Sequence, residues 1–361
     1  MAVHFHPLKI KDIKRETSDC VSVSFEVPES LAAEFSFKEG QNLTLRTTID
    51  GKEVRRSYSL CEAPHEAGLR VAIKKVDGGL FSRFANDTLA KGDIVDVMPP
   101  VGKFNAHLTE SGIGNYLAIV AGSGITPVIS IIKHTLKLQA GSRFTLIYGN
   151  RSRSSIIFFE ELEGLKNKYM DRFNLINVLS REKTDSGINY GRIDKDKLSA
   201  LQQQLSFPAF DSVYICGPER MIFESREFLE QNGVDRNKIH FELFTTPGQP
   251  TGSLKQSDTE IQPVDVGLKS KVSVRLDGRS FEFDLPFAGE AILDAALKQG
   301  ADLPYACKGG VCCTCRAKLL EGQVSMDVNY ALEPEEVAQG FILTCQSHPR
   351  TERVVVDFDV K

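Results

Sequence analysis

Four cysteines in the C-terminal part of the chain constrain this sequence more than any other feature. They are Cys307, Cys312, Cys315 and Cys345, so three stand close together in a C-x4-C-x2-C pattern and the fourth follows at a distance. This is the plant-type spacing of ligands for a [2Fe–2S] cluster, in which one tight loop supplies most of the thiolates. The spacing therefore predicts a [2Fe–2S] site and electron transfer.

The alternatives to a cluster are a zinc site, disulfides or unligated structural thiols. Zinc sites usually combine two C-x2-C-like pairs, and this segment has one. Cys313 stands beside two predicted ligands, and we interpret it as a non-ligand because its use would break the spacing. Gly309 and Gly310 allow positive φ angles and a close approach of the backbone, so we expect amide hydrogens to point at the cluster.

Length and charge narrow the class of protein. A chain of 361 residues suits two or three domains. A formal net charge of −4 gives no electrostatic reason to expect nucleic acid or an anionic membrane as a partner. Because we find neither a secretory signal nor a run of membrane-spanning length, we expect a cytoplasmic protein. In that reducing compartment the cysteines outside the predicted cluster set are expected to be free thiols.

The first two blocks of the chain differ in their patterns. Residues 1–108 contain short alternating β-rich runs separated by Gly and Pro, which predict a small antiparallel β-barrel. Residues 109–244 alternate apolar strands with helical stretches, beginning with a strand at 116–121 and a helix at 127–139. That alternation predicts an α/β domain with a parallel, doubly wound sheet.

The rest of the chain divides into a linker and a third domain. Residues 245–268 are rich in Pro, Gly, Ser, Thr and Gln, so we expect a flexible linker. Residues 269–361 begin with two strands joined at Asp277-Gly278, a hairpin signal, and continue with a helix at 292–299 and the cysteine loop. This order of elements predicts an α+β domain around the cluster.

A glycine-containing turn, Gly122-Ser123-Gly124-Ile125-Thr126-Pro127, follows a strand directly and opens a helix. Gly122 and Gly124 let the backbone approach a pyrophosphate, and helix N-termini attract phosphate. We expect Thr126 to cap the helix and Pro127 to lie in its first turn. Because the third glycine of the Rossmann fingerprint is absent, a plain strand-to-helix turn is an equal alternative.

Basic residues follow the next two strands of this block. Arg151 comes after the strand at 144–148, with Arg153 just beyond it, and Ser180-Arg181 end the strand that begins at Leu175. The acidic residue with which NAD-binding Rossmann domains hold a ribose is absent there. Arginine side chains pair with a 2′-phosphate, so the pattern favours NADPH, while NADH and plain surface arginines stay open as alternatives.

Two segments of the first block have the chemistry of a flavin site. Arg55-Arg56-Ser57-Tyr58-Ser59-Leu60 ends a strand, and Gly78-Gly79-Leu80-Phe81-Ser82 starts a short helix. An arginine can clamp a pyrophosphate, a tyrosine can stack on a flat ring, and a helix N-terminus can take phosphate oxygens. Taken separately, each segment is equally an ordinary piece of barrel or turn.

Taken in order, these motifs and Cys216-Gly217-Pro218 resemble the ferredoxin–NADP reductase superfamily, and the four cysteines resemble a fused plant-type ferredoxin of β-grasp-like fold. Within this superfamily the chain is similar to the reductase subunits of phenylacetyl-CoA epoxidases, which serve di-iron oxygenase subunits in phenylacetate breakdown. The stretches that carry this similarity are 146–151, 303–312 and 354–359. The resemblance implies FAD, a [2Fe–2S] cluster and NADPH, with NADH as the alternative nucleotide.

The resemblance also implies roles for flavin-binding residues. Arg56 would bind the flavin pyrophosphate, Tyr58 would pack on the isoalloxazine ring, and Ser59 would hydrogen-bond near its N5 atom. Gly79 and Ser82 would hold further phosphate oxygens.

On the nucleotide side, the resemblance implies that Cys216 lies near the nicotinamide C4 atom. Gly217 and Pro218 would shape that turn. Glu242 and Phe244 match the acidic and aromatic positions that close the family's site.

Electron counting connects the three cofactors. A nicotinamide gives up two electrons as hydride whereas a [2Fe–2S] cluster accepts one at a time, so a flavin is required between them. We therefore predict a reductase that passes electrons from NADPH through FAD and [2Fe–2S] to the di-iron subunits of an oxygenase. Two alternatives stay open. One is a reductase of a Rieske-type oxygenase or another hydroxylase, using FMN or NADH, and the other is a redox-sensing carrier without rapid turnover.

Overall fold

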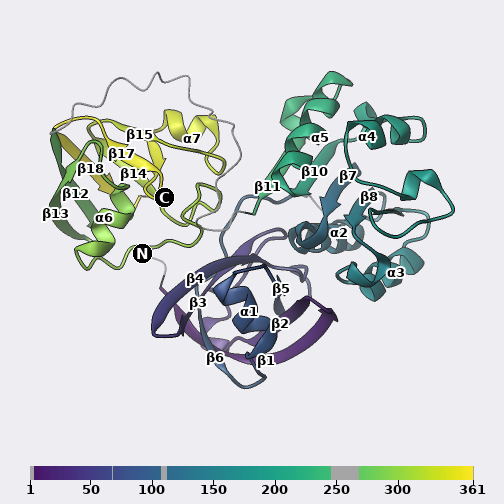
Figure 1. The fold of residues 1–361 in the computed structure, drawn as a ribbon, viewed down its shortest axis with the longest axis horizontal. Helices are drawn as coiled ribbons and strands as arrows, with labels where there is room; N and C mark the ends of the chain where they lie inside the picture. Colours follow the sequence, from purple (N-terminus) through teal and green to yellow (C-terminus); the bar gives the residue numbers. More distant parts are fainter. Residues whose placement is uncertain (1–3, 67, 107–111, 245–267, 361) are drawn as a thin grey trace. The chain divides into compact units, whose positions relative to one another are not determined.

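A computed structural model of the chain describes residues 4–66, 68–106, 112–244 and 268–360 (Figure 1). Internal contacts divide the chain into two compact units. The larger unit holds residues 5–54 and 58–244. The described residues 4 and 268–360 belong to the smaller unit, and so do residues 55–57 from the middle of a barrel strand. The predicted linker at 245–268 lies outside the described residues except for Leu268, and the predicted domain boundaries stay predictions.

The N-terminal half of the larger unit is an antiparallel barrel, and α1 lies in the middle of its strands in the view of Figure 1. Its elements are β1 (His6–Thr17), β2 (Cys20–Glu26), β3 (Asn42–Ile49), β4 (Lys52–Ser59), β5 (Leu69–Lys74), α1 (Leu80–Asp87) and β6 (Ile94–Val97). The strand order is β4-β3-β6-β1-β2-β5, and an antiparallel bridge from Leu60 to Val71 joins the two ends of that order. Apolar strand residues such as Val23 and Val71, together with Phe81 of α1, fill the interior, which confirms the predicted barrel.

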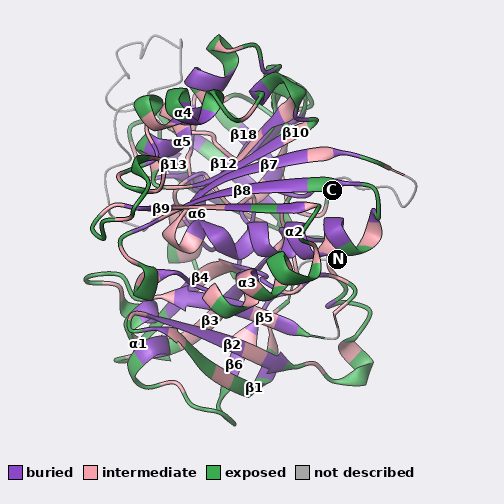
Figure 2. Ribbon diagram, turned by 90° about the vertical axis from the view of Figure 1, so that its right-hand side faces the viewer, coloured by how far each residue is buried: buried purple, intermediate pink, exposed green. Residues whose placement is uncertain are grey.

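The second half of the larger unit is a parallel sheet with helices packed against it. Its elements are β7 (Asn115–Ala121), α2 (Ile125–Leu138), β8 (Arg143–Asn150), α3 (Phe159–Lys168), β9 (Phe173–Leu179), α4 (Lys195–Gln202), β10 (Ser212–Gly217), α5 (Glu219–Gln231) and β11 (Ile239–Leu243). The order β11-β10-β7-β8-β9 is parallel throughout. Strands covered on both faces need nearly continuous apolar runs, and Figure 2 shows β7, β8 and α2 largely buried. The predicted doubly wound domain is therefore confirmed.

The smaller unit is an α+β domain built on a mixed sheet. Its elements are β12 (Lys269–Leu276), β13 (Arg279–Pro286), α6 (Ile292–Lys298), β14 (Arg316–Glu321), β15 (Val324–Met326), α7 (Pro334–Ala338), β16 (Phe341–Leu343), β17 (Ser347–Pro349) and β18 (Arg353–Asp357). In the main sheet, of order β13-β12-β18-β14-β16, β12 and β18 are parallel and the other pairs are antiparallel. Asp277 and Gly278 have φ angles of 52° and 69°, as a tight hairpin turn requires.

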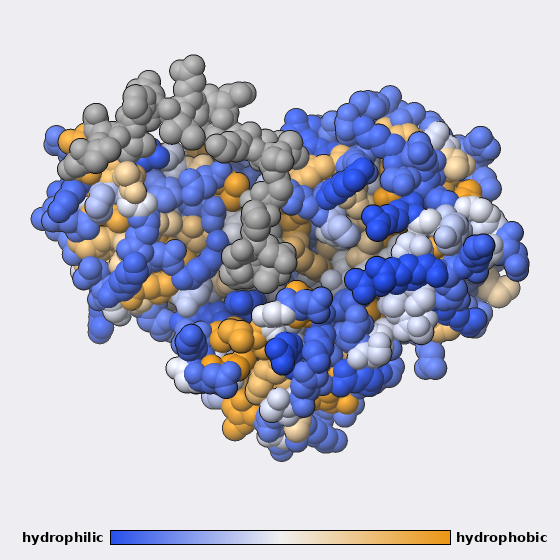
Figure 3. Space-filling model, in the orientation of Figure 1, coloured by the Kyte–Doolittle hydropathy of each residue, from blue (hydrophilic) through white to orange (hydrophobic). Residues whose placement is uncertain are grey.

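The described surface is polar on the face that Figure 3 presents, where hydrophilic residues predominate and hydrophobic residues form small patches. Large apolar side chains that stay exposed, such as Ile94, Ile113 and Met170, belong to different elements or loops. Within the described ranges, every helix is too short or too polar to cross a membrane.

Candidate functional site

The four predicted cluster ligands of the smaller unit come together in two pairs. The Cys312 thiol donates a hydrogen bond to the Cys307 sulfur, which lowers the pKa of Cys307. The Cys315 thiol donates to the Cys345 sulfur and lowers the pKa of Cys345. Among the described residues, no group of three or more His, Cys, Asp or Glu side chains is arranged to hold a single metal ion. Two thiolate pairs are what the two irons of a plant-type cluster require, since each iron takes two.

Backbone and side-chain amides point at the sulfurs of these cysteines. The Gly309 N–H donates to Cys307 Sγ at 3.3 Å, and the Gly310 N–H donates to Cys345. Gln346 Nε2 donates to Cys345 Sγ at 3.6 Å. Because such donors stabilise negative charge on sulfur, this cradle fits a [2Fe–2S] cluster, which when bound would accept and release one electron at a time.

The cluster loop takes its unusual backbone from one of the two predicted glycines and from two other residues. Gly310 has a φ angle of 75°, but Gly309 is not among the residues with positive φ, and Lys308 and Cys313 have φ angles of 50° and 51°. Gln346 Nε2 donates to the Lys308 carbonyl at 3.0 Å and thereby supports this strained position. The Cys313 thiol donates to the Ala331 carbonyl at 3.0 Å, a contact that suits its interpretation as a non-ligand, which stays a prediction.

The predicted flavin residues lie on β4 and at the start of α1. The Tyr58 ring packs against Phe81 of α1, with 5.6 Å between ring centroids. Arg56 stands two residues earlier on the same strand, and its place at the flavin pyrophosphate stays a prediction. The structure thus brings an aromatic ring of β4 and the N-terminal turn of α1 together in the barrel.

The start of α1 depends on Gly79 and Ser82. Ser82 Oγ accepts a hydrogen bond from the Val76 amide at 3.1 Å and donates to the Gly79 carbonyl at 3.4 Å. A Cβ at Gly79 would lie only 2.5 Å from that hydroxyl. Helix α1 has Gly79 as its N-cap and no side-chain cap, so its N-terminal amides fit the phosphate groups of a flavin nucleotide, which when bound would accept hydride and pass on single electrons. Direct phosphate contacts by Ser82 stay a prediction.

The turn at Gly122–Gly124 differs in detail from its prediction. Helix α2 begins at Ile125 with Gly124 as its N-cap and without a side-chain cap, so the prediction that Thr126 caps the helix is wrong. The reason is a short 3-10 turn at Gly122–Gly124, after which the helix starts at Ile125, earlier in the chain than predicted. Thr126 therefore lies inside the first turn, and its hydroxyl donates to the Ser123 carbonyl. Pro127 lies in the first turn, as predicted.

The two glycines of this turn have different functions in the fold. A Cβ at Gly124 would lie 2.2 Å from the Cys216 carbonyl oxygen, so this glycine allows close packing against the end of β10. Gly122 has a φ angle of 55°, and an added Cβ there would meet only Lys74 Nζ, at 3.9 Å. The backbone at Gly122 is thus the part of the turn that fits the approach of a pyrophosphate.

Cys216 lies at the carboxyl end of β10, between Val120 of β7 and Glu242 of β11. Gly217 follows it, and Pro218 is the N-cap of α5. The Cys216 side chain is fully buried, and burial together with the Glu242 charge raises the pKa of its thiol well above the usual value. The thiol is therefore protonated at neutral pH. Ser59 Oγ donates to Glu242 at 3.3 Å, so the end of the flavin strand meets the end of β11.

The predicted nucleotide-binding arginines also come together. The Arg181 amide donates to the Arg151 carbonyl at 2.8 Å, and the Ser180 amide donates to the Asn150 carbonyl at 2.9 Å. Because β8 and β9 are parallel, their carboxyl ends meet at one edge of the sheet, as the sequence predicts. Whether these residues hold a 2′-phosphate stays a prediction.

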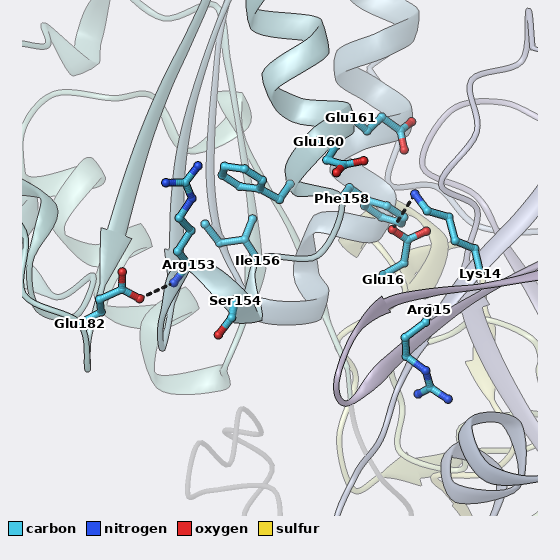
Figure 4. Close-up of a pocket in the computed structure, with 11 residues that line it drawn as sticks. Lys14, Arg15, Glu16, Arg153, Ser154, Ile156, Phe158, Glu160, Glu161 and Glu182 are labelled. Atoms are coloured by element: carbon cyan, nitrogen blue, oxygen red, sulfur yellow. Dashed lines mark hydrogen bonds and ion pairs between the residues drawn. The ribbon is translucent and has the colours of Figure 1, made fainter.

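A pocket of about 660 Å³ opens between the barrel and the segment that follows β8 (Figure 4). Lys14, Arg15 and Glu16 line it from β1, and Arg153, Phe159 and Glu182 line it from the other side. The Arg153 amide donates to the Glu182 carboxylate at 2.8 Å. The contribution of β1 and of Glu182 escaped the sequence analysis, because no local pattern pairs residues so distant in the chain.

Comparisons with known proteins agree with this arrangement. The chain matches an oxidoreductase FAD-binding domain over residues 7–106, an oxidoreductase NAD-binding domain over 118–227 and a 2Fe-2S iron-sulfur cluster binding domain over 274–350. These matches support FAD over the alternative FMN, and a [2Fe–2S] cluster over the alternative zinc site.

Several relatives match over nearly their whole length. The chain is 45% identical to a component of the 1,2-phenylacetyl-CoA epoxidase of Escherichia coli (strain K12), covering 99% of this chain and 98% of that one. It is 34% identical to the ferredoxin reductase component of 3-ketosteroid-9-alpha-monooxygenase from Rhodococcus rhodochrous, covering 97% and 96%.

Solved structures show the same fold. Phthalate dioxygenase reductase, a modular structure for electron transfer from pyridine nucleotides to [2Fe–2S], covers 98% of both chains with a TM-score of 0.57 and 24% identity. An intact type IV self-sufficient cytochrome P450 monooxygenase matches 98% of this chain with 41% of its own length, a TM-score of 0.67 and 22% identity. With its FAD, NAD and [2Fe–2S] domains in one polypeptide, the chain belongs to the family of reductase components that carry electrons from NAD(P)H to oxygenases.

Proposed function

We propose that this reductase takes electrons from NADPH and delivers them to the di-iron oxygenase subunits of a phenylacetyl-CoA epoxidase. The contact between Ser59 and Glu242 carries the reductase part of the proposal, because it joins the flavin strand to the sheet edge that holds Cys216. The choice of partner is supported by the 45% identity with the 1,2-phenylacetyl-CoA epoxidase component of Escherichia coli, which extends over 99% of the chain.

In this proposal the side chains bind and orient the cofactors, and none acts as a nucleophile. Arg56 holds the flavin pyrophosphate, Tyr58 packs on the flavin ring and Ser59 hydrogen-bonds near its N5 atom. Gly79 and Ser82 shape the phosphate site at α1. Cys216, whose buried thiol is protonated and therefore uncharged, lies near the nicotinamide C4 atom.

The nucleotide occupies the turn at Gly122 and Gly124, with Thr126 and Pro127 in the first helical turn behind it. Gly217 and Pro218 shape the nicotinamide end. Arg151, Ser180 and Arg181 provide donors for a 2′-phosphate at the other end, which supports NADPH over NADH.

Reconstitution tests the partner directly. The purified chain, mixed with the oxygenase subunits of a phenylacetyl-CoA epoxidase, is expected to support NADPH-dependent oxygenation of phenylacetyl-CoA, with NADH less effective. A Rieske-type oxygenase given the same amount of reductase serves as the control. Turnover with the Rieske-type oxygenase and none with the di-iron subunits would contradict the proposed partner while leaving the reductase function intact.

A second candidate has support from other relatives. Reductase components of 3-ketosteroid-9-alpha-monooxygenase and of glycine betaine monooxygenase from Pseudomonas aeruginosa are 34% and 30% identical to the chain over nearly its full length. A hydroxylase other than a phenylacetyl-CoA epoxidase is therefore the alternative acceptor. The redox-sensor hypothesis loses support, because these relatives are reductase components.

We also propose a cytoplasmic location. Cys20, Cys61 and Cys216 are buried free thiols, and burial raises the pKa of the thiols of Cys61 and Cys216. Free thiols of this kind are typical of proteins from a reducing compartment.

A further inference from the structure

Six charged side chains meet where the barrel packs against the nucleotide-binding half of the larger unit. We name them the ionic joint: two cations, Arg70 and Lys133, and four carboxylates, Glu16, Glu62, Glu66 and Glu161. The barrel supplies all but Lys133 of α2 and Glu161 of α3. Figure 4 shows Glu16 and Glu161 at the wall of the pocket, so the joint lies beside the space between the two halves.

Each cation of the joint bonds to carboxylates of both halves. Lys133 Nζ lies 2.7 Å from Glu62 and 2.9 Å from Glu66 across the boundary, and 2.5 Å from Glu161 of its own half. Arg70 makes the reverse connection, with Glu161 at 2.9 Å across the boundary and Glu62 at 2.5 Å within the barrel. The joint is therefore a cross-link between the two halves.

The two cations of this cross-link are largely buried, so their charges need partners. Lys133 has 5% of its side chain exposed and Arg70 has 13%. Burial opposes the charge on Lys133, but Glu161 and Glu62 outweigh it and raise the pKa of the ammonium group above its usual value. Removal of either cation would leave the partly buried carboxylates of Glu62 and Glu161 to share one cation in place of two, which is unfavourable, so the two halves are held in an arrangement that keeps both cations in place.

The joint connects directly to the elements that carry the cofactor residues. Lys133 also donates to the Cys61 carbonyl at 3.2 Å, and Ser130 of α2 donates to the Glu62 carbonyl at 2.5 Å. Cys61 and Glu62 follow Ser59 at the end of the flavin strand by two and three residues. At its other end, α2 begins at the Gly122–Gly124 turn, whose last glycine packs against the Cys216 carbonyl.

We infer that Lys133 is a positioning residue for hydride transfer. Through the joint it fixes the segment after Ser59 against α2, and so sets the approach of the nicotinamide to the flavin. Hydride transfer depends steeply on the distance and angle between donor and acceptor, so a loosened joint slows the reaction more than it weakens nucleotide binding. This inference rests on the proposed function, because it requires NAD(P)H to reduce the flavin of this chain.

The test compares Lys133→Met with Lys133→Arg in the full, cofactor-loaded protein. Lys195 pairs with Glu227 on the exposed surface of the nucleotide-binding half, so Lys195→Met is the matched control for loss of a lysine ion pair. Stopped-flow absorbance would follow flavin reduction by NADPH and by NADPH deuterated at the transferred position. Hydrogen–deuterium exchange would follow the Cys61 amide, which donates to the Arg70 carbonyl.

Lys133→Met is expected to slow flavin reduction at saturating NADPH by about tenfold or more, with the dissociation constant of the nucleotide changed by less than about threefold. The isotope effect should rise, and the long-wavelength absorbance of the nicotinamide–flavin complex should weaken. Exchange at Cys61 should become faster. Lys133→Arg should restore most of the rate, and Lys195→Met should change none of these quantities.

A folded Lys133→Met protein that retains FAD and shows the unchanged rate and isotope effect would overturn the inference. If Lys133→Met fails to fold, Glu161→Gln decides, because it removes one carboxylate from both cations while leaving Glu62 and Glu66 in place. It should slow flavin reduction by about threefold with a raised isotope effect, and an unchanged rate would again overturn the inference. Failure of the unaltered protein to accept electrons from either nucleotide would refute the proposed function instead.

Discussion

The cluster loop and the ionic joint are built in opposite ways. The loop places three of the four predicted ligands within nine residues of one another, and backbone amides of the same loop point at the sulfurs. The joint gathers its charges across the larger unit: Lys133 and Glu62 are 71 positions apart in the chain, and Arg70 and Glu161 are 91 positions apart. A site that holds a metal cluster can be encoded locally, whereas a site that aligns two cofactors depends on how separate elements pack.

The largest expected effect abolishes the function of the cluster loop and leaves flavin reduction nearly unchanged. Cys345→Ala should abolish the visible absorbance of the cluster and all electron delivery to the oxygenase, because one iron loses a thiolate. Flavin reduction by NADPH should stay within about twofold of the original rate, since the cysteine lies outside the flavin and nucleotide domains. Absorbance spectra and stopped-flow reduction measure both quantities.

Cys313→Ala is the matched control for that change and should keep the cluster. The opposite result, in which Cys313→Ala loses the cluster and Cys345→Ala retains it, would show that Cys313 is a ligand.

The next largest effect comes from a substitution that disturbs the close packing of the Gly122–Gly124 turn against β10. Gly124→Ala places a Cβ against the Cys216 carbonyl and should destabilise the protein by about 3 kcal/mol or slow flavin reduction by about tenfold, because the turn must move. Denaturant unfolding and stopped-flow reduction measure these effects, and the cluster spectrum should be unchanged.

Gly164→Ala provides the control, since a Cβ at this exposed position of α3 has nothing within 4 Å. It should stabilise the protein by about 0.5–1 kcal/mol through helix propensity. If both alanines have the same small effect, close packing at Gly124 is not what requires a glycine.

A smaller effect tests nucleotide preference at the sheet edge. Arg181→Ala should raise the KM for NADPH by about tenfold and leave the KM for NADH nearly unchanged, because the proposed charge-assisted contact to the 2′-phosphate would be lost. Arg236→Ala, an exposed arginine of the same domain, should change neither value. An equal rise for both nucleotides would argue against a 2′-phosphate contact.

The smallest effect sharpens the description of the cluster loop. Gln346→Leu removes the side-chain donor to Cys345 Sγ and should lower the reduction potential of the cluster by about 40 mV, the equivalent of one hydrogen bond of about 1 kcal/mol. A spectroelectrochemical titration measures the shift, with Gln323→Leu at an exposed position as control. A shift to higher potential would mean that the amide does not stabilise the reduced cluster.

Much of the fold followed from local patterns. Continuous apolar runs predicted β7, β8 and β10 because a parallel sheet covered on both faces excludes water from every strand. The Asp277-Gly278 turn predicted the hairpin of β12 and β13, since both residues tolerate positive φ. The start of α2 was predicted incorrectly, with Thr126 as the cap of a helix from Pro127, because the 3-10 turn before Ile125 depends on the packing of Gly124 against β10.

The amino-acid sequence by itself determined the cofactor chemistry: the cysteine spacing indicated [2Fe–2S], and the arginine–tyrosine–serine strand and the glycine turn, taken in order with it, indicated FAD and a pyridine nucleotide. Only the tertiary structure decided which of these residues meet. Ser59 and Glu242 lie 183 residues apart, and neither carries a local signal for the other. Lys133 and its three carboxylates likewise carry no local signal for one another. Their ion pairs depend on which surfaces the barrel and the sheet bury against each other, and hydrophobic packing determines those surfaces.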